Sequence, residues 1–495
     1  MKTWMIQGTS SSVGKSLLVA ALCRIFTRRG VKVAPFKAQN MSNNAAVCPD
    51  GAEIGRAQAV QAMAARMVPT ADLNPVLLKP EADARAQVVL MGRPWKTLPA
   101  RGYYQHRAQL WPAITGALDR LRQHYELVII EGAGSPVELN LRAGDMVNMA
   151  LARHAQCPVL LAGDIDRGGV FAQLLGTLWL LEEEERRLVR GLIVNKFRGD
   201  PTLFTDGIRI LEERSGLPVL GVIPYLQDLR LPEEDAVALD AAKRHGVARQ
   251  DVIDIAVIRL PRISNFDDFD ALQGEAEVQV RYVASVAELG RPHAIILPGT
   301  KSTAGDLDWL GQQGLAHTIS QLAKDGVAIV GICGGYQMLG TRILDPDRVE
   351  SSARAIAGLG LLPVETTFVA AKATHQARAR IAASSGWLAE LAGQELTGYE
   401  IHMGRTPSPR PWLEIVERSG QAAREVDGSA RGAGRIWGCY LHGLFANDHF
   451  RHAWLRSLGW REAGNATVSL EESFERLADA VENSLDMSTL DAILR

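Results

Sequence analysis

The feature that most constrains the fold is a glycine-rich loop at residues 8–16, which reads Gly-Thr-Ser-Ser-Ser-Val-Gly-Lys-Ser. A short, mostly apolar run at residues 4–7 precedes the loop, and apolar residues recur at helical spacing after it. This pattern predicts a strand, a tight turn and a helix. At such a junction, backbone N–H groups and the positive end of the helix dipole converge and bind phosphate. The loop therefore predicts a parallel α/β sheet with a phosphate site at the carboxyl edge of its strands.

The loop residues have separate predicted roles in binding ATP. Gly8, Thr9 and Gly14 are expected to bring the backbone close to the phosphates. Lys15 supplies a positive charge, and the hydroxyl of Ser16 is a candidate ligand of Mg²⁺. The loop is one residue longer than the common form, and this spacing resembles the dethiobiotin-synthetase-like branch of P-loop proteins. A glycine-serine turn without a ligand is the alternative, which the strand–loop–helix context disfavours.

Polar groups also follow the second predicted strand, at residues 32–36. Lys37, Gln39 and Asn40 lie where the carboxyl end of a parallel strand presents a ligand site, so we assign them to the substrate. The segment from about residue 38 to 125 is too long for a simple crossover helix. It predicts an elaborated substrate-binding insertion.

Later strands of this sheet are expected to end in polar residues at the same edge. Glu131 closes an apolar run and is a second candidate ligand of Mg²⁺. Asp166 follows the next run and is assigned to the substrate, and Asn195 ends a further run in a loop that resembles base-reading loops of nucleotide-binding folds. Asp145 stands at the start of an apolar helix, where capping is the simplest role.

A second strand–turn–helix pattern occupies residues 327–340. Cys333 ends an apolar run, and glycines follow it directly. A side chain at such an elbow stands clear of the sheet, beside N–H groups that can stabilise an oxyanion, so Cys333 is a candidate nucleophile. Gly334 and Gly299 are the candidate oxyanion donors. The alternative is a buried cysteine on a core strand, because free cysteines are among the most buried residues.

The base predicted for Cys333 is His442, which ends another short apolar run. His402 is a second histidine that could compete for this role. Three aspartates lie in the segment 264–270, where we expect loop and capping roles because the spacing lacks the other oxygen ligands of a calcium site.

The Cys333 elbow and the downstream His442 resemble the class I glutamine amidotransferases, which hydrolyse glutamine. That family usually has an acid two residues after the histidine, where this chain has Leu444. We therefore expect His442 to lack a carboxylate partner, and glutamine hydrolysis to be slow unless the synthetase site is occupied.

Ordered motifs along nearly the whole chain are similar to the cobyric acid synthase family. They are Gly8 to Ser16, residues 36–41, residues 131–134, residues 263–266, residues 333–337 and residues 399–403. The resemblance implies glutamine- and ATP-dependent amidation of the b, d, e and g carboxylates of adenosylcobyrinic acid a,c-diamide, with Asp145 facing the substrate. The alternatives are the sister enzyme that amidates the a and c carboxylates of cobyrinic acid, and a P-loop regulatory ATPase with a degenerate amidase domain.

With 495 residues the chain is too long for one ordinary domain. We predict an α/β protein with two doubly wound, mostly parallel sheets, the first P-loop NTPase-like and the second class I glutamine amidotransferase-like. The expected boundaries are a synthetase domain at 1–228, a linker at 229–250, an amidotransferase domain at 251–450 and a helical segment at 451–495.

Composition limits the partners and the compartment. The 54 basic and 56 acidic residues nearly cancel, which gives no electrostatic case for nucleic acid or a membrane surface. Five scattered cysteines favour a reducing compartment, and no apolar stretch is long enough for a membrane span, so a cytoplasmic location is expected. The sequence does not indicate an oligomeric state.

Overall fold

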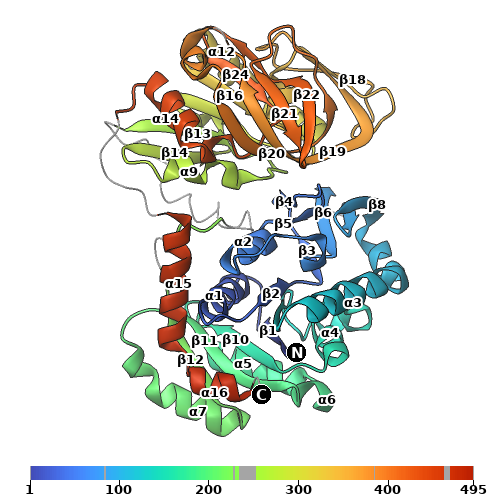
Figure 1. Cartoon of the computed structure of the whole chain (residues 1–495), viewed down its shortest axis with the longest axis vertical. Helices are drawn as coiled ribbons and strands as arrows, with labels where there is room; N and C mark the ends of the chain where they lie inside the picture. The colour runs from blue at the N-terminus through green and yellow to red at the C-terminus, as the bar shows by residue number, and fades with distance from the viewer. Residues whose placement is uncertain are drawn as a thin grey trace.

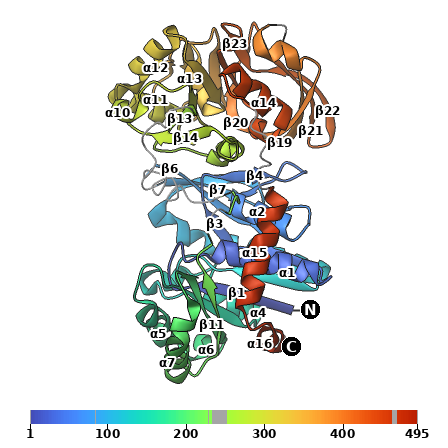
Figure 2. The ribbon, with the colours of Figure 1, turned by 90° about the vertical axis from the view of Figure 1, so that its left-hand side faces the viewer.

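The computed structural model describes residues 2–82, 85–226, 229–232, 252–383, 385–461 and 469–493. These residues form two lobes stacked along the long axis, as Figures 1 and 2 show from two sides. The lower lobe in Figure 1 contains the amino-terminal domain, and the upper lobe contains residues 253–457.

The lower lobe is built on a six-stranded sheet in the order β12-β11-β10-β1-β9-β2, with every neighbouring pair parallel. Its strands are β1 (Lys2–Gly8), β2 (Val33–Phe36), β9 (Leu127–Glu131), β10 (Val159–Asp164), β11 (Val189–Phe197) and β12 (Val219–Pro224). The helices of this layer are α1 (Lys15–Arg28), α3 (Arg107–His124), α4 (Met149–Ala155), α5 (Val170–Leu180), α6 (Glu183–Arg186) and α7 (Thr205–Ser215). The central strands are buried throughout, because helices cover both faces of a parallel sheet.

The segment after β2 builds two small sheets above the main one. A four-stranded sheet has the order β3-β6-β7-β8, and β4 pairs with β5. The strands are β3 (Gln39–Met41), β4 (Ala45–Val47), β5 (Glu53–Gly55), β6 (Val76–Ala82), β7 (Arg85–Leu90) and β8 (Arg93–Pro99). Helix α2 (Arg56–Ala64) follows β5 and packs on α1.

The upper lobe has a second six-stranded sheet in the order β14-β13-β15-β16-β24-β23, parallel except for β23. Its strands are β13 (Ile253–Ile258), β14 (Val278–Val283), β15 (Ala294–Leu297), β16 (Ala328–Ile332), β23 (Ser429–Arg431) and β24 (Ile436–Cys439). Its helices are α9 (Asp270–Gln273), α10 (Val286–Leu289), α11 (Thr303–Gln312), α12 (Leu315–Lys324), α13 (Gly334–Leu339) and α14 (Asp448–Ser457). The predicted fold class, two doubly wound and mostly parallel sheets, is confirmed.

A mostly antiparallel sheet, which the sequence analysis did not predict, extends this lobe. Its order is β18-β17-β19-β21-β22, and β20 pairs with β19. The strands are β17 (Arg342–Leu344), β18 (Ala355–Ala357), β19 (Glu365–Ile381), β20 (Glu395–Arg405), β21 (Leu413–Arg418) and β22 (Gln421–Asp427). The long strands β19 and β20 face the lower lobe (Figure 1).

The last two helices return to the lower lobe. Helix α15 (Leu470–Ser484) lies along α1, and α16 (Met487–Ile493) packs near β12. Arg24 of α1 is fully buried and bonds Glu471 at 2.8 Å and Glu475 at 3.1 Å. The expected segment 451–495 is therefore divided, because α14 begins before it and belongs to the upper lobe. The exact domain boundaries stay a prediction.

Buried charges and apolar residues join the two lobes. Glu53 of β5 is fully buried and forms ion pairs with Lys79 of β6 and with Lys372 of β19. Burial alone would raise the pKa of Glu53, but the charges of the two lysines and their hydrogen bonds lower it to about 2. A small apolar cluster crosses the same boundary; its members are Ala45, Val47, Leu77, Val89, Tyr399 and Ile401.

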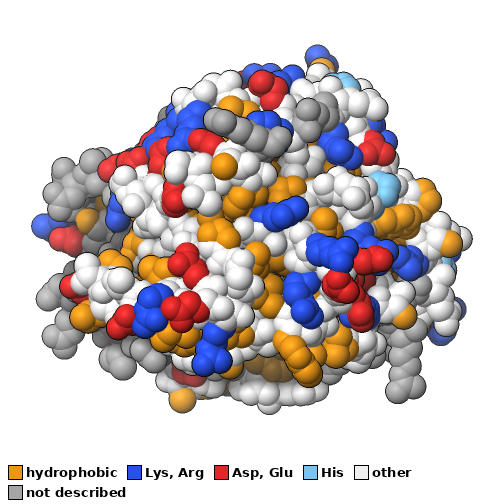
Figure 3. Space-filling view, turned by 90° about the horizontal axis from the view of Figure 1, so that it is seen from below, with side chains coloured by type: hydrophobic (Ala, Val, Ile, Leu, Met, Phe, Trp, Pro, Cys, Tyr) orange, Lys and Arg blue, Asp and Glu red, His pale blue; other side chains and the backbone are white. Residues whose placement is uncertain are grey.

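The surface carries both signs of charge. Figure 3 shows Lys and Arg side chains interspersed with Asp and Glu over the lower face of the molecule. Within the described ranges, no helix combines the length and the apolar character needed to cross a bilayer.

Candidate active sites

Cys333 lies at the elbow between β16 and α13, as predicted. Its backbone φ is 52°, in the left-handed region that a residue with a Cβ rarely adopts. Such strain is typical of functional positions, where the surrounding structure holds it. The side chain is only 7% exposed, and its Sγ lies 3.4 Å from the carbonyl oxygen of Ile401. The elbow therefore presents the thiol to a small enclosed space.

The structure brings His442 to Cys333. Strand β24 pairs in parallel with β16, with Cys439 opposite Ile332, so both residues leave the sheet at the same edge. His442 is almost fully buried, and its side chain and that of Cys333 line the same small pocket. The two predicted catalytic residues therefore meet in space.

The expectation that His442 lacks a carboxylate is wrong. Asp268 Oδ2 lies 2.7 Å from His442 Nδ1, and the other oxygen of Asp268 accepts a hydrogen bond from Gly443 N at 2.9 Å. Leu444, at the family's usual acid position, is instead part of the core. Asp268 comes from a 3₁₀ turn at Phe266–Phe269, in the segment that we had assigned to loop and capping roles.

The Asp268 carboxylate determines the charge state of the histidine. Burial lowers the pKa of His442, but the charge of Asp268 and hydrogen bonds with Asp268 and Cys333 outweigh burial and raise the pKa to about 10. With Nδ1 engaged by Asp268, Nε2 is the ring nitrogen left for the thiol. The raised pKa favours the imidazolium form of His442 in the pocket that it shares with Cys333. A neighbouring cation is one of the features that activate a cysteine nucleophile.

His402 does not occupy the position of the base. Its Nδ1 lies 2.9 Å from the carbonyl oxygen of Gly404, and its ring stacks on Tyr440 with centroids 3.8 Å apart. It lines the pocket next to Cys333 without contacting Asp268, so the geometry favours His442.

The two candidate oxyanion glycines flank the nucleophile. A Cβ on Gly299 would lie 2.9 Å from His442 Cε1, so only glycine allows the ring to approach this closely. Gly334 is the first residue of α13 and lies against Thr300. Gly299 directly precedes Thr300 in sequence, so the two glycines are close in space. The small pocket in front of Cys333 measures about 60 Å³ and is lined in part by Lys79, which comes from the lower lobe.

The glycine-rich loop connects β1 and α1 as predicted. Lys15 folds over the loop and donates to the carbonyl oxygens of Ser10 at 2.8 Å and Gly134 at 2.9 Å. Gly14 has a φ of 100°, and a Cβ there would lie 2.4 Å from the amide nitrogen of Asn195. Asn195 donates to the carbonyl oxygen of Val13 at 2.8 Å, so its amide braces the loop in this structure.

The remaining loop residues lie where the sequence placed them. Gly8 ends β1, and a Cβ on it would lie 2.9 Å from Lys15 Nζ. Thr9 donates its backbone N–H to Ala162 at 3.0 Å and its hydroxyl to Gln173 at 3.2 Å. These contacts fix the start of the loop against β10.

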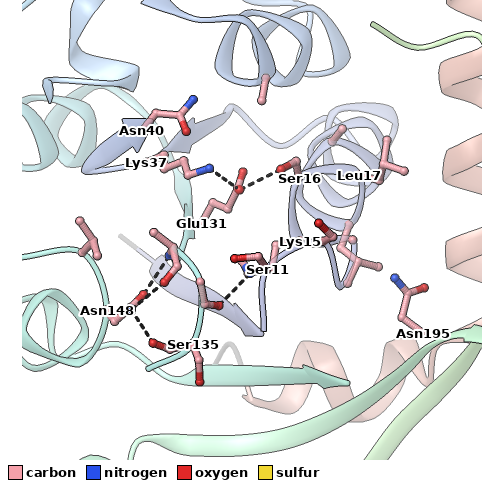
Figure 4. Close-up of a pocket in the computed structure, with 18 of the residues that line it drawn as sticks. Ser11, Lys15, Ser16, Leu17, Lys37, Asn40, Glu131, Ser135, Asn148 and Asn195 are labelled. Atoms are coloured by element: carbon pink, nitrogen blue, oxygen red, sulfur yellow. Dashed lines mark hydrogen bonds and ion pairs between the residues drawn. The ribbon is translucent and has the colours of Figure 1, made fainter. Parts of the chain in front are cut away.

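Ser16 and Glu131 meet beneath the loop, as Figure 4 shows. Ser16 Oγ donates to Glu131 at 2.9 Å, Lys37 Nζ lies 2.9 Å from the same carboxylate, and Gln61 donates to it at 2.6 Å. Burial alone would raise the pKa of Glu131, but Lys37, Gln61 and Ser16 hold it below its ordinary value. An ionised carboxylate beside a hydroxyl supplies the oxygen ligands that Mg²⁺ prefers, so these residues fit the ion.

Three of the five predicted substrate residues surround the same cavity edge. Lys37 and Asn40 are buried, and Gln39 accepts a hydrogen bond from Tyr103. Asn40 donates to Gln58 of α2 at 2.9 Å. Lys37, Gln39 and Asn40 all line one cavity, and Figure 4 shows Lys37 and Asn40 above Glu131.

The two predicted acidic substrate residues have structural partners. Asp145 accepts hydrogen bonds from the backbone of Val147, Asn148 and Ala150, each at 2.9 Å, which is a capping role. It also lines the cavity. Asp166 pairs with Arg198 and is not among the residues that line the cavity.

One large cavity contains the nucleotide loop and most of the predicted substrate residues. Its volume is about 1280 Å³, compared with about 300–1,000 Å³ for ordinary ligand pockets. Its wall includes Leu477 and Val481 of α15, so the last part of the chain helps to enclose it. The cavity has room for a nucleotide and a second, large ligand.

Family comparisons match both halves of the chain. The CobQ/CobB/MinD/ParA nucleotide binding domain matches residues 4–238, and the CobB/CobQ-like glutamine amidotransferase domain matches residues 254–450. Three similar relatives are named cobyric acid synthase. The Chloroflexus aurantiacus protein is 56% identical over 99% of both chains. The Roseiflexus castenholzii protein is 55% identical over 96% of both chains. The Moorella thermoacetica protein is 50% identical over all of this chain and 97% of its own.

A nucleotide-binding domain joined to an amidotransferase domain defines the class of this protein, a carbon–nitrogen ligase that takes its nitrogen from glutamine. The identity to full-length relatives narrows this class to one family. The chain belongs to the cobyric acid synthase family. The predicted family and the predicted use of ATP are thereby confirmed.

Proposed function

We propose that this chain amidates the b, d, e and g carboxylates of adenosylcobyrinic acid a,c-diamide, using ATP and L-glutamine. One observation carries the proposal: the chain contains both a phosphate loop and the Cys333, His442 and Asp268 arrangement. Proteins named cobyric acid synthase match this chain over nearly its full length. The large cavity beside the loop supports a bulky second ligand.

In the proposed glutaminase reaction, Cys333 Sγ attacks the side-chain amide carbon of glutamine. His442 carries the proton as an imidazolium, which Asp268 stabilises, and gives it to the departing ammonia. The N–H groups of Gly299 and Gly334 are proposed to donate to the oxyanion. Water then hydrolyses the thioester and releases glutamate.

In the proposed synthetase reaction, a substrate carboxylate attacks the γ-phosphorus of ATP and ADP leaves. Ammonia then attacks the acyl phosphate carbon, phosphate departs, and the amide forms. Lys15 offsets the charge of the phosphates, with Gly8, Thr9 and Gly14 holding the backbone of the cradle close to them. Asn195 braces this loop, and its position supports a place for the base nearby.

Ser16 and Glu131 would hold Mg²⁺, which when bound neutralises charge on the phosphates. Lys37, Gln39 and Asn40 are proposed to orient the substrate carboxylate at the same edge. For Asp145 we propose a contact with the substrate through the cavity wall that it helps to cap. The ion pair of Asp166 with Arg198 supports only an indirect role for that residue.

The compartment and the kind of partner are proposed from the composition of the chain. The five cysteines are all free and buried, which supports a reducing, cytoplasmic setting. The balance of charge supports small-molecule partners over nucleic acid.

One incubation tests the function. Purified protein is mixed with the a,c-diamide, ATP, Mg²⁺ and glutamine, and mass analysis counts the amides formed. A parallel reaction offers cobyrinic acid instead of the diamide. Four new amides on the diamide support the proposal, whereas consumption of cobyrinic acid alone would assign the chain to the sister reaction. ATP hydrolysis without any amide would indicate a regulatory ATPase.

A further inference from the structure

Helix α2 of the lower lobe reaches both reaction sites. At its start, Arg56 contacts the amidotransferase domain, and five positions later Gln61 contacts the nucleotide site. A helix rises about 1.5 Å per residue, so the two contacts are separated by about 7.5 Å along one rigid element. Figure 1 shows α2 between the P-loop sheet and the upper lobe.

Arg56 is bound to residues of the upper lobe at several points. Its Nη2 donates to the Tyr399 hydroxyl at 2.6 Å, and its guanidinium lies 5.2 Å from the centre of the Tyr399 ring. Its Nε lies 3.0 Å from Asp267 Oδ2. Asn265 donates to the same Tyr399 hydroxyl and to the carbonyl oxygen of Ala45, each at 2.8 Å. A side chain of the synthetase domain therefore contacts residues of the amidotransferase domain that lie directly behind the lining of the glutaminase pocket.

Both residues held by Arg56 are neighbours of the catalytic histidine. The Tyr399 ring stacks on His442 with centroids 5.1 Å apart and planes 11° apart. The backbones of Tyr399 and His442 also exchange two hydrogen bonds, at 2.9 and 3.2 Å. Asp267 directly precedes Asp268, which holds His442 Nδ1. Arg56 therefore contacts the neighbours of His442 on both the face and the Nδ1 side of its ring.

The other end of α2 contacts the predicted nucleotide and metal residues. Gln61 donates to Glu131 at 2.6 Å and to the carbonyl oxygen of Ser16 at 3.3 Å. Gln58 accepts from Asn40, which lies at the proposed substrate edge. A ligand at Glu131 or Asn40 that displaces one of these hydrogen bonds would act on α2.

We infer that Arg56 is a positioning residue of the glutaminase, supplied by the synthetase domain, which sets the His442 ring through Tyr399 and Asp267 and ties glutamine hydrolysis to the nucleotide site through α2. The inference rests on the proposed function for the roles of the two sites. Beyond that function, helix α2 and its residue Arg56 are assigned as the link through which ligand binding at the nucleotide site changes glutamine hydrolysis.

The test follows the reactivity of Cys333 rather than the complete reaction. The rate of Cys333 alkylation by iodoacetamide is measured from pH 6 to 10, with and without a non-hydrolysable ATP analogue and Mg²⁺, together with kcat and KM for glutamine. Wild type is expected to change its alkylation rate about tenfold on adding the analogue, within the usual range of coupling between sites. Arg56→Ala is expected to lose this response and to lower kcat for glutamine hydrolysis about tenfold with little change in KM.

Two further variants separate positioning from general damage to the interface. Gln376→Ala removes a hydrogen bond from β19 to the carbonyl oxygen of Val47, which crosses the same boundary away from Tyr399, and should respond like wild type. Tyr399→Phe removes the hydroxyl that Arg56 holds while keeping the stacked ring, and should weaken the response even if Arg56→Ala does not fold.

The outcomes are decisive in both directions. The inference would be overturned if the analogue left the wild-type alkylation rate unchanged. It would also be overturned if folded Arg56→Ala responded to the analogue as wild type does, or if Gln376→Ala lost the response as fully as Arg56→Ala. Failure of the proposed function is seen separately, as an absence of corrinoid amidation when wild type is supplied with ammonium instead of glutamine.

Discussion

Asp268 Oδ2 and His442 Nδ1 lie 2.7 Å apart, although 174 positions separate the two residues in the chain. The second oxygen of Asp268 is fixed by Gly443 N, so the carboxylate cannot rotate away without losing a hydrogen bond. A carboxylate held in this way sets the tautomer of the histidine and stabilises its charged form. The proposed glutaminase site therefore contains a cysteine, a histidine and an acid, and the acid comes from a different part of the domain than the position two residues after the histidine.

Asp268→Asn is expected to lower glutamine-dependent amidation about 100-fold, because the histidine loses the partner that orients it. Synthesis from ammonium should be unchanged, since that route does not use the triad. Steady-state rates with each nitrogen donor check this. Near-normal glutamine use in a folded variant would show that Asp268 is only a structural partner of Gly443.

The raised pKa of His442 gives a stability signature. A histidine with a folded-state pKa near 10 and an ordinary value of 6.5 stabilises the fold fully below pH 6.5, and this contribution is lost as the pH rises through 10. The difference in unfolding free energy between wild type and Asp268→Asn should therefore be largest near pH 6 and shrink toward pH 10. Urea denaturation at several pH values measures it. A constant difference would contradict the ion pair.

Cys333→Ala should abolish glutamine-dependent synthesis while retaining synthesis from high ammonium at mildly alkaline pH, where more free ammonia exists. Only the atom that attacks glutamine is removed. His442→Ala should behave similarly, with some residual glutamine use because part of the thiol ionises unaided. Product formation with each donor is the measurement, and a folded Cys333→Ala protein that still uses glutamine would remove the elbow from the mechanism.

Lys15→Ala is expected to reduce amidation by about 100-fold or more with either nitrogen donor, because the charge that faces the phosphates is lost. Alkylation of Cys333 without nucleotide should proceed as in wild type, which serves as the control for folding. Substantial ATP-dependent product from this variant would exclude Lys15 from the nucleotide site.

Glu53→Gln is expected to destabilise the protein by about 3–5 kcal/mol, because it leaves Lys79 and Lys372 buried without their carboxylate. The lowered pKa of Glu53 means that its contribution is present above pH 4.5 and is lost as the pH falls toward 2. The variant should therefore show a weaker loss of stability than wild type between pH 4.5 and the lowest pH at which both remain folded. If the unfolding free energies of the two proteins changed equally with pH over that range, the ion pairs of Glu53 with the two lysines would be contradicted.

Local sequence was sufficient where one short segment forms the whole feature. The phosphate loop and the Cys333 elbow are each a strand, a turn and a helix within about a dozen residues, so composition and periodicity identified them. The placement of each at the carboxyl edge of its own sheet follows from the rule that ligands bind beyond the carboxyl ends of parallel strands. His442 was found because it follows the apolar run that forms β24, in the same sheet as Cys333, and because it falls at the histidine position of the resembling family.

Residues whose role depends on tertiary contact were missed. Asp268 lies among three nearby aspartates that serve equally well as caps, and only the folded chain shows which one reaches His442. Arg56 resembles any basic residue at the start of a surface helix until β20 brings Tyr399 to it. Strand β19 does alternate buried and exposed residues over its second half, a period-two signal that could have predicted the extra sheet.

Helix α15 follows the amidotransferase domain in sequence but packs on α1 of the synthetase domain. The amidotransferase domain is therefore inserted between two segments of the synthetase domain. Arg24, Arg28 and Arg29 of α1 form ion pairs with acidic residues of α15, over an apolar contact that includes Phe474. Cutting the chain once, after the first domain, would leave that half-enzyme without the helix that closes its own cavity. The two activities therefore cannot be separated into independent proteins by a single break, and a working synthetase half would need residues 469–493 restored by circular permutation or supplied in trans.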